Sequence, residues 1–252
     1  MLLSQDQLAE YNENGYIIIK NFLTNDEIEC LLSENDEQTH LNKFKHSRKD
    51  TNGKESKISL WNHPSDNIYG NIARSHKLVD RVEELLGGEV YHWHSKMMLK
   101  EAKTGGAWEW HQDYGYWYNN GCLTADLASC MMGINHSTKE NGCLQVLKGS
   151  HKIGRIDHGE VGGQTGANKE RVQEAEKKYE KVYVELDPGD ALFFHSNLLH
   201  TSAPNESEQS RLVLICCYNK KDNSPFIENS GHPKYTPLVK INDDEILSVI
   251  KV

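Results

Sequence analysis

The spacing of hydrophobic residues predicts helices in the amino-terminal part of the chain and strands in the rest. Ser4 and Gln7 have the spacing of a capping box, and the helix that they begin should end near Gly15. The apolar run at 16–19 follows directly and is typical of a strand. The chain should therefore open with a short helix that leads into a strand.

The pattern that predicts a helix start occurs a second time in the amino-terminal part. Thr24 and Glu27 form a second capping box, which predicts another helix. Residues 38–57 are polar and charged with little periodicity, and we expect a surface loop there. A helical pattern runs from 66 to 86 and closes on Gly87-Gly88, which is typical of a helix C-cap.

From residue 89 onward, short apolar and aromatic runs alternate with turn sequences. Asn141-Gly142 and Pro188-Gly189-Asp190 are typical of turns, because Gly tolerates positive φ and Pro presets φ. Many short strands with such punctuation predict a sandwich or barrel. The expected strands lie at 89–100, 107–112, 128–134, 143–147, 181–186, 191–195 and 211–218.

One charged segment interrupts the strands. Residues 168–180 have helical spacing and follow a Gly-rich stretch, so that about residues 155–180 are expected to form a lid-like insertion. The sequence contains no internal repeat. We predict one domain over residues 1–252, with a helical amino-terminal part at about 1–88 and a β core at about 89–220.

Composition and charge narrow the classes of function. A hydrophobic content of 37% suits a globular protein with a core, and a net charge of −9 disfavours nucleic acid and anionic membranes as partners. No apolar run reaches the roughly 18 residues of a membrane span, and the first residues lack the apolar run of a signal peptide. The six cysteines form no C-x-x-C pair. We therefore expect a cytoplasmic protein that acts on a small molecule.

The main chemical signal is the segment His111-Gln112-Asp113. In a strand, residues two apart point to the same face, so His111 and Asp113 can bind one ion. A distal histidine, His200, follows a turn and an apolar strand. Two imidazoles and one carboxylate leave positions open on Fe(II), as in non-haem iron oxygenases. We predict that these three residues are the catalytic metal ligands.

An arginine and a serine beyond the distal histidine suggest a co-substrate. Arg211 lies 11 residues after His200 (211 − 200 = 11) and begins an apolar strand. An arginine inside a barrel requires an anion, and its fork suits a carboxylate. Ser202 should share the face of His200. Together these residues suit the far carboxylate of 2-oxoglutarate.

Other histidines compete with these assignments. His195 is an alternative distal ligand, although its place in an apolar run favours core packing. His158 and Glu160 form a second ligand-like pair, but in a Gly-rich loop that would hold ligands poorly. His92 and His94 alternate on an expected strand, where a partly buried strand face is the simpler interpretation.

Taken together, the motifs resemble the phytanoyl-CoA dioxygenase family, which includes the ectoine hydroxylases. The resemblance spans roughly residues 5–220 and rests on His111-Gln112-Asp113, Glu140-Asn141-Gly142-Cys143-Leu144, Gly149-Ser150-His151, Pro188-Gly189-Asp190, His200-x-Ser202 and Arg211. It implies a mainly β fold, with a double-stranded β-helix (jelly-roll or cupin-like) core and flanking amino-terminal helices. It also implies an Fe(II)- and 2-oxoglutarate-dependent dioxygenase that consumes O2, hydroxylates its substrate and releases succinate and CO2.

The resemblance implies further roles. Lys100 matches a lysine that precedes the metal motif in relatives, which implies contact with 2-oxoglutarate; a solvated lysine at a strand end is the alternative. Met131 stands where relatives place an aromatic residue in the co-substrate pocket, with core packing as the alternative. Lys148 replaces the usual Pro before Gly-Ser-His, which affects only the turn. Halogenases of the superfamily lack the carboxylate that Asp113 supplies, so hydroxylation is expected.

The residues after the metal motif suggest a substrate class. Tyr114, Tyr116 and Trp117 should lie at the pocket mouth, where aromatic faces suit a cationic group. Arg155, together with Lys152, can contact an anion. These residues predict a small polar metabolite, nitrogen-bearing or zwitterionic. A metal-binding cupin-like protein or isomerase, a zinc hydrolase and a true acyl-CoA hydroxylase stay open as alternatives.

Overall fold

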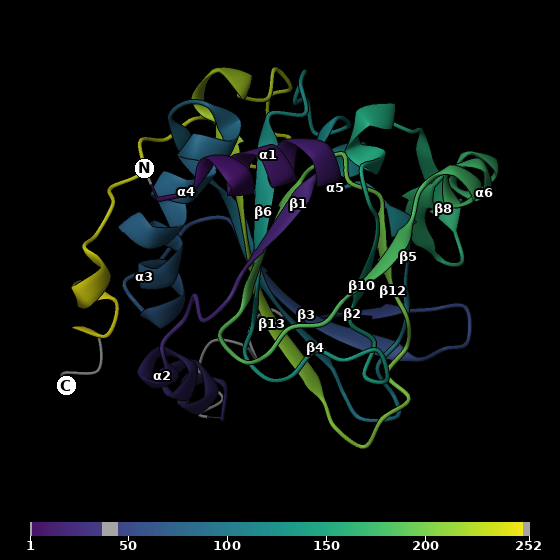
Figure 1. The fold of residues 1–252 in the computed structure, drawn as a ribbon, viewed down its shortest axis with the longest axis horizontal. Coiled ribbons are helices and arrows are strands. Elements are labelled where there is room, and N and C mark those ends of the chain that lie inside the picture. Colours follow the sequence, from purple (N-terminus) through teal and green to yellow (C-terminus); the bar gives the residue numbers. More distant parts are fainter. Residues whose placement is uncertain (1, 37–44, 249–252) are drawn as a thin grey trace.

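Two facing antiparallel β-sheets form the centre of the molecule (Figure 1). The computed structural model describes residues 2–36 and 45–248. The larger sheet has the order β1 (Tyr16–Ile19), β11 (Ala191–His195), β6 (Leu127–Gly133), β13 (Arg211–Lys220), β4 (Val90–Lys100), β3 (Glu55–Trp61) and β2 (Lys45–Lys49). The smaller sheet has the order β10 (Lys181–Val184), β7 (Leu144–Leu147), β12 (His200–Ser202) and β5 (Trp108–His111).

Helices cover the outer face of the larger sheet (Figure 1). They are α1 (Gln5–Asn14), α2 (Asn25–Asp36), α3 (Ile68–Arg74) and α4 (His76–Leu86). The strands between the helices and the smaller sheet are mostly apolar because both of their faces are buried. In β13, for example, Leu214 packs toward the helices whereas Val213 and Ile215 face the second sheet.

A hairpin and a helix extend from the smaller sheet, where the insertion was expected. They comprise β8 (His158–Val161), β9 (Gln164–Ala167) and α6 (Lys169–Lys178). Helix α6 buries Val172 and Ala175 in a small apolar cluster with Leu199. The insertion is therefore attached to the core through apolar packing, next to the strand that carries His200.

The predicted helix ends are confirmed by their hydrogen bonds. The Ser4 side chain accepts from the Gln7 backbone N–H, and the Gln7 side chain accepts from the Ser4 N–H. Gly15 closes α1 in the left-handed conformation. The second capping box forms in the same way between Thr24 and Glu27. The seven strands expected after residue 89 are also present.

Three expectations were wrong. The helix expected at 66–86 is two helices, because Ser75 adopts an extended conformation (φ −65°, ψ 144°) and bridges to Ile241. Within the loop expected at 38–57, residues 45–49 form one strand and residues 55–57 begin another, β3, while 38–44 lie outside the described residues. The region after the metal motif, which was expected to place its aromatic residues at the pocket mouth, forms the short helix α5 (Asp113–Trp117).

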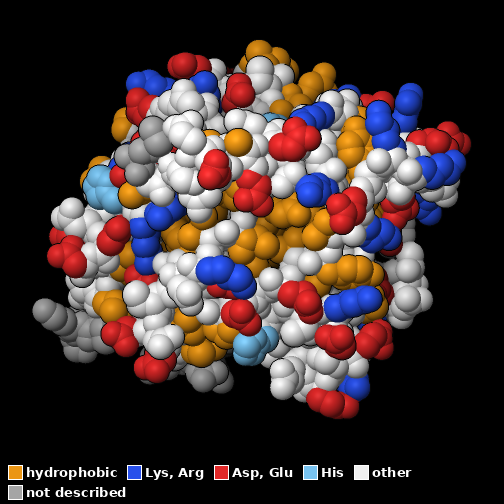
Figure 2. All heavy atoms as spheres, in the orientation of Figure 1, with side chains coloured by type: hydrophobic (Ala, Val, Ile, Leu, Met, Phe, Trp, Pro, Cys, Tyr) orange, Lys and Arg blue, Asp and Glu red, His pale blue; other side chains and the backbone are white. Residues whose placement is uncertain are grey.

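The surface shows mixed charge. On the face seen in Figure 2, acidic and basic side chains are interspersed around a central group of apolar ones. Within the described residues, no helix has both the length and the apolar character that crossing a membrane requires.

Candidate active site

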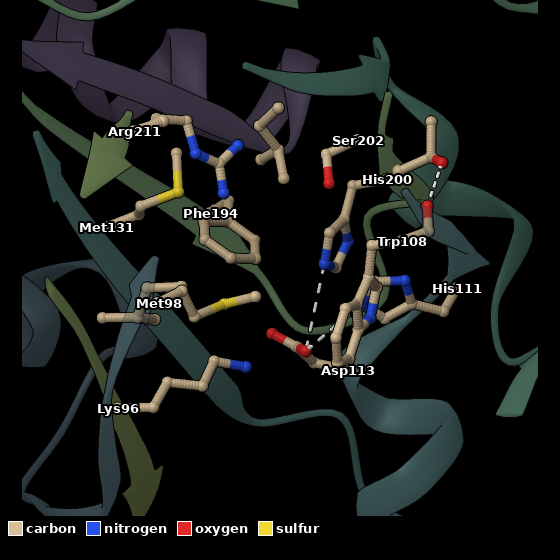
Figure 3. Close-up of a pocket in the computed structure, with 13 residues that line it drawn as sticks. Lys96, Met98, Trp108, His111, Asp113, Met131, Phe194, His200, Ser202 and Arg211 are labelled. Atoms are coloured by element: carbon tan, nitrogen blue, oxygen red, sulfur yellow. Dashed lines mark hydrogen bonds and ion pairs between the residues drawn. The ribbon is translucent and has the colours of Figure 1, made fainter. Parts of the chain in front are cut away.

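Three buried side chains converge between the sheets: His111, Asp113 and His200 (Figure 3). One ligand atom of each lies within 4.8 Å of those of the other two. Asp113 Oδ1 is 4.0 Å from His111 Nε2 and 3.9 Å from His200 Nε2. Metal–ligand bonds of about 2 Å therefore allow one ion to bind all three atoms. This is the one such group of His, Cys, Asp and Glu in the described parts of the chain.

Strand pairing brings the two histidines together. His200 on β12 lies directly opposite His111 on β5, and their ring centroids are 4.0 Å apart. The chain turns into helix α5 immediately after β5, which places Asp113 beside both rings. The spacing of two residues predicted that His111 and Asp113 would meet, and they do so although Asp113 lies just beyond the strand.

Hydrogen bonds at Nδ1 orient both imidazoles and leave Nε2 of each available to bind a metal. His111 Nδ1 lies 2.7 Å from the Glu109 carbonyl oxygen, and His200 Nδ1 lies 2.8 Å from that of Leu198. A carbonyl only accepts hydrogen bonds, so Nδ1 carries the proton and Nε2 keeps its lone pair for a metal. Burial lowers the pKa of each histidine, which favours the neutral, metal-binding form.

The carboxylate is also oriented. Ser129 Oγ on β6 donates to Asp113 Oδ2 at 2.9 Å, so that Oδ1 is the oxygen that faces the two imidazoles. Ser129 is fully buried and lies 3.2 Å from Cys217 Sγ. Sequence analysis missed this residue. Its one signal was a hydroxyl in the otherwise apolar strand at 127–133.

The donor set fits iron. Two neutral imidazole nitrogens and one carboxylate oxygen approach from one side, and the other side opens into a pocket with about 430 Å³ of space between protein atoms. The pocket is lined by Lys96, Met98, Trp108, His111, Asp113, Met131, Leu144, Phe194, His200, Thr201, Ser202, Arg211 and Ile215.

Arg211 lies at one end of this pocket (Figure 3). Its side chain is only 2% exposed, and one guanidinium nitrogen donates to the Gly142 carbonyl. Among the residues that the structure describes, nothing accepts a hydrogen bond from its Nε. Burial lowers the pKa of Arg211 to about 10, so the guanidinium stays charged at neutral pH. A buried cation with a free donor is suited to an anionic ligand.

The Asn141-Gly142 turn supports that arginine. Gly142 has φ +80°, and a Cβ there would lie 2.3 Å from the Ala203 carbonyl oxygen. Only glycine fits this position, and its carbonyl is the acceptor for Arg211. The Asn141 side chain stabilises the turn by accepting from the Thr138 N–H at 2.8 Å.

Lys100 and Ser202 form a pair beside the arginine. Lys100 is opposite Arg211 in the register of β4 and β13, and it is fully buried. Its ammonium donates to Ser202 Oγ at 2.7 Å and to the Ala203 carbonyl. Ser202 lines the pocket, whereas Lys100 is not among the lining residues. The structure thus places Lys100 behind Ser202 rather than at a solvated strand end.

A bulge changes the expected role of Trp108. Alternation along a regular strand predicts that Trp108 packs on the face opposite His111. The register between β5 and β12 shifts between His200 and Ser202, however, so three residue steps of β5 lie opposite two of β12. Trp108 consequently shares the pocket with His111, while Trp110 packs near α6. Met131 also lines the pocket.

Three of the residues expected at the substrate mouth lie elsewhere. Because 113–117 form a helix, Tyr114 turns inward and donates to the Leu123 carbonyl at 2.7 Å, and Trp117 packs against Trp93. Arg155 pairs with Asp157 on the surface. None of these three is among the residues that line the pocket, which corrects the expectation for them.

Tyr116 lies closer to the metal ligands. Its ring centroid is 5.4 Å from that of His111, and its hydroxyl donates to the Thr165 carbonyl at 2.7 Å. Tyr116 therefore connects the ligand strand to the insertion, although it is not a lining residue of the pocket.

The competing histidines are placed apart from the ligand group. His195 Nδ1 accepts from the Asn197 N–H, and the His195 ring lies beside Tyr11 and His151. His158 Nε2 accepts from the Gln112 N–H at 2.9 Å, which occupies the nitrogen that a metal would need.

His92 and His94, the two histidines of strand β4, also lie apart from the ligand group. His92 contacts the Asn62 carbonyl and Ser95, whereas His94 packs against Trp117. Neither belongs to a group of three possible metal ligands among the described residues.

Gln112, between the two ligands of the motif, fastens the insertion. Its amide nitrogen donates to the Gly154 carbonyl at 2.8 Å and to that of Asn197 at 2.7 Å. Its amide oxygen accepts from the Ile156 N–H at 2.7 Å. One fully buried side chain thus ties the metal motif to both the insertion and the segment before His200.

Comparison with known proteins agrees with this geometry. The sequence model described as "Phytanoyl-CoA dioxygenase (PhyH)" matches residues 11–213. L-proline trans-4-hydroxylase of Streptomyces griseoviridis is 30% identical over 197 residues, covering 72% of each chain. An ectoine dioxygenase of Halomonas elongata is 25% identical over 253 residues, covering 92% of this chain and 76% of that enzyme.

A solved structure has the same architecture. EctD from S. alaskensis, crystallised with 2-oxoglutarate and 5-hydroxyectoine, matches with a TM-score of 0.80 at 22% identity, over 96% of this chain and 88% of that one. The likeness confirms the predicted fold class of a mainly β, double-stranded β-helix with flanking helices.

Proposed function

The chain belongs to the phytanoyl-CoA dioxygenase family, and we propose that it hydroxylates a small polar metabolite, nitrogen-bearing or zwitterionic, with release of succinate and CO2. It is a 2-oxoglutarate-dependent dioxygenase that uses iron. The observation that carries the proposal is one pocket in which His111, Asp113 and His200 lie beside the charged side chains of Lys96 and Arg211. Two relatives are named for proline and ectoine, which are small nitrogen-bearing molecules.

Each pocket residue has a role in this proposal. His111, Asp113 and His200 hold the iron, which when bound supplies the activation of O2, with 2-oxoglutarate as the electron donor. Arg211 binds the far carboxylate of 2-oxoglutarate, with the Ser202 hydroxyl beside it. Lys100 positions Ser202 through the 2.7 Å hydrogen bond. Met131 and the other apolar lining residues exclude water from the reacting centre.

We place the enzyme in the cytoplasm. All six cysteines are buried and none forms a disulfide, which suits a reducing compartment that also keeps iron ferrous.

The substrate class is tested by a screen for succinate release. Small amino acids, amines, betaines and aminophosphonates are compared with phytanoyl-CoA and free fatty acids, each with Fe(II), 2-oxoglutarate and O2. We expect stimulation of 2-oxoglutarate turnover by at least one of the small molecules. Stimulation by the acyl-CoA alone would contradict the proposal and favour a true acyl-CoA hydroxylase.

The ligand assignment is tested separately. We expect His200→Ala to abolish the visible band that forms when Fe(II) and 2-oxoglutarate are added without oxygen, since two ligands hold iron poorly. His195→Ala should keep the band, because that imidazole contacts Asn197 and not the metal group. The opposite result would move the distal ligand to His195.

A further inference from the structure

We propose that Lys96 binds an anionic group of the substrate and thereby makes the enzyme selective for amino acids and similar zwitterions over their uncharged analogues. The proposal rests on the function proposed above and names the group that the substrate must carry. Lys96 was not predicted from the sequence, because a lysine in a strand is more often solvated.

Strand β4 directs Lys96 into the pocket. Residues two apart share a face of a strand, so His94, Lys96, Met98 and Lys100 point toward the smaller sheet. The register against β13 shifts between Cys217 and Tyr218, which places this bulge of β4 before His94 and leaves the alternation after it regular. Lys96 and Met98 line the pocket, and the Lys96 side chain extends toward Asp113 in Figure 3.

The ammonium of Lys96 has no protein anion. Across residues 2–36 and 45–248, the structure gives it neither a hydrogen bond nor an ion pair, although it is only partly exposed. Its neighbours differ: Lys100 donates to two oxygens, and Lys57 on β3 pairs with Glu101 at 2.6 Å. A partly buried cation without a partner is unfavourable, and an anionic ligand would relieve that.

Asp113 does not fill this role. Its Oδ2 accepts from Ser129 and its Oδ1 faces the two histidines, so both oxygens have a function at the metal group. No ion pair joins Lys96 to Asp113 within the described residues. The anion must therefore come from a bound molecule.

That molecule is the substrate and not 2-oxoglutarate. Arg211 lies opposite Lys100, four residues from Lys96, which is roughly 13 Å along a strand. In Figure 3, Arg211 and Lys96 enter the pocket from opposite sides, with Met98 and Met131 between them. The co-substrate has two carboxylates, of which one is assigned to Arg211 and the other to the metal. A third anion at Lys96 belongs to the second reactant.

His94, on the same face of β4 as Lys96, is a second polar side chain without a hydrogen-bond partner among the described residues. His94 is buried, and neither of its ring nitrogens has a hydrogen-bond partner among the described residues. Its ring lies beside Trp117 and His232. This end of the strand therefore carries an unpaired ammonium and an unpaired imidazole, whereas the Arg211 end is hydrogen-bonded to the protein.

Binding measured without turnover tests the proposal. The protein is loaded with Ni(II), which does not support the reaction, and with 2-oxoglutarate, and is titrated by calorimetry. The probes are amino acids, including L-proline, each paired with its carboxamide, together with 2-aminoethylphosphonate. We expect at least one acid to bind at least ten times more tightly than its amide. Tight binding of the phosphonate would extend the same recognition to a second anion.

Variants locate the recognition at Lys96. Lys96→Met should weaken binding of the acid by tenfold or more and leave the amide unchanged, while Lys96→Arg should retain part of the preference. Lys57→Met is the matched control, since its ammonium pairs with Glu101 outside the pocket, and it should bind like the parent protein. Equal binding of acid and amide, an unchanged preference in Lys96→Met, or no binding by any probe would overturn the proposal.

The failure of this proposal is distinguishable from failure of the proposed function. The visible band of Fe(II) with 2-oxoglutarate reports the metal group and Arg211, and it should persist in Lys96→Met. Succinate release stimulated only by uncharged amines would keep the proposed function and reject the role of Lys96. Absence of the band from the parent protein would instead reject the co-substrate assignment.

Discussion

At the scale of single residues, a serine outside the motif sets the orientation of the metal carboxylate. We expect Ser129→Ala to weaken Fe(II) binding by roughly 10- to 100-fold, as losses of hydrogen bonds to metal ligands commonly do. The reason is that Asp113 Oδ2 loses its 2.9 Å hydrogen bond and the carboxylate can rotate. Competition against a metal chelator measures the affinity.

The control is another buried serine. Ser196 donates to the Ala125 carbonyl at 2.8 Å and does not touch the carboxylate of Asp113. Ser196→Ala should therefore retain the affinity for iron even where its stability falls. An equal loss in both variants would mean that Ser129 acts only through stability.

Arg211 gives the second prediction at this scale. Removing one partner of a buried charge pair costs about 3–5 kcal/mol, so Arg211→Ala should weaken 2-oxoglutarate binding by orders of magnitude while iron still binds. Arg211→Lys should recover part of the loss, because an ammonium lacks the fork of a guanidinium. Titration of the Fe(II) protein with 2-oxoglutarate measures this.

A surface arginine serves for comparison. Arg155 pairs with the exposed Asp157, and Arg155→Ala should bind 2-oxoglutarate normally. Unchanged 2-oxoglutarate affinity in Arg211→Ala would remove the basis of its assignment.

At the scale of elements, the Gln112 side chain ties the metal motif to the insertion. In Gln112→Ala, two carbonyls and one N–H lose their partners, and each unsatisfied buried group costs roughly 1–3 kcal/mol. We expect a lower free energy of unfolding and faster proteolysis within 155–180. Urea titration and mass spectrometry of the fragments test both effects.

A glutamine on the insertion itself provides the control. Gln173 is exposed on helix α6, so Gln173→Ala should leave the urea midpoint and the cleavage pattern unchanged. Cleavage of Gln112→Ala elsewhere, with 155–180 intact, would contradict the idea that this side chain fastens the insertion.

Elements differ in how well the sequence predicts them. Strands that are buried on both faces, such as β6 and β13, stand out as apolar runs, and the seven strands expected after residue 89 were found. Strand β12 was missed because three residues show no periodicity. The edge strand β2 and the start of its neighbour β3 were missed because their polar residues have the composition of a loop. The inward turn of Tyr114 was missed because helix α5 is too short to show a pattern.

The residues of the candidate site also differ in how well the sequence predicts them. His111 and Asp113 were predicted to meet because they are two residues apart, and His200 and Arg211 were singled out because such residue types are rare beside apolar strands. Ser129, Trp108 and Lys96 depend on strands that are distant in sequence or on a bulge. Sequence spacing alone does not encode such contacts.

At the scale of the whole molecule, several buried histidines make stability depend on pH. Burial lowers the pKa of His92, His195 and His232 to about 4 each. In the unfolded chain a histidine titrates near 6.5, so between pH 6.5 and 4 the unfolded state binds more protons. The free energy of unfolding should therefore fall as the pH falls through this window.

Replacing His92 measures the contribution of this one histidine to the pH dependence of the free energy of unfolding. For His92, which is 5% exposed, the displaced pKa corresponds to roughly 3 kcal/mol of stability lost by pH 4. His92→Gln should flatten the pH dependence measured by urea unfolding, whereas His136→Gln, at an exposed position, should not. An identical pH profile in all three proteins would contradict this account.

The burial of Arg211 and the partial exposure of Lys96 have a kinetic consequence. With 2-oxoglutarate bound at the buried Arg211, as we propose, a substrate already at Lys96 would obstruct its entry. We therefore expect ordered binding, in which 2-oxoglutarate binds before the substrate. Steady-state rates follow a sequential pattern, in which an unreactive substrate analogue is an uncompetitive inhibitor toward 2-oxoglutarate.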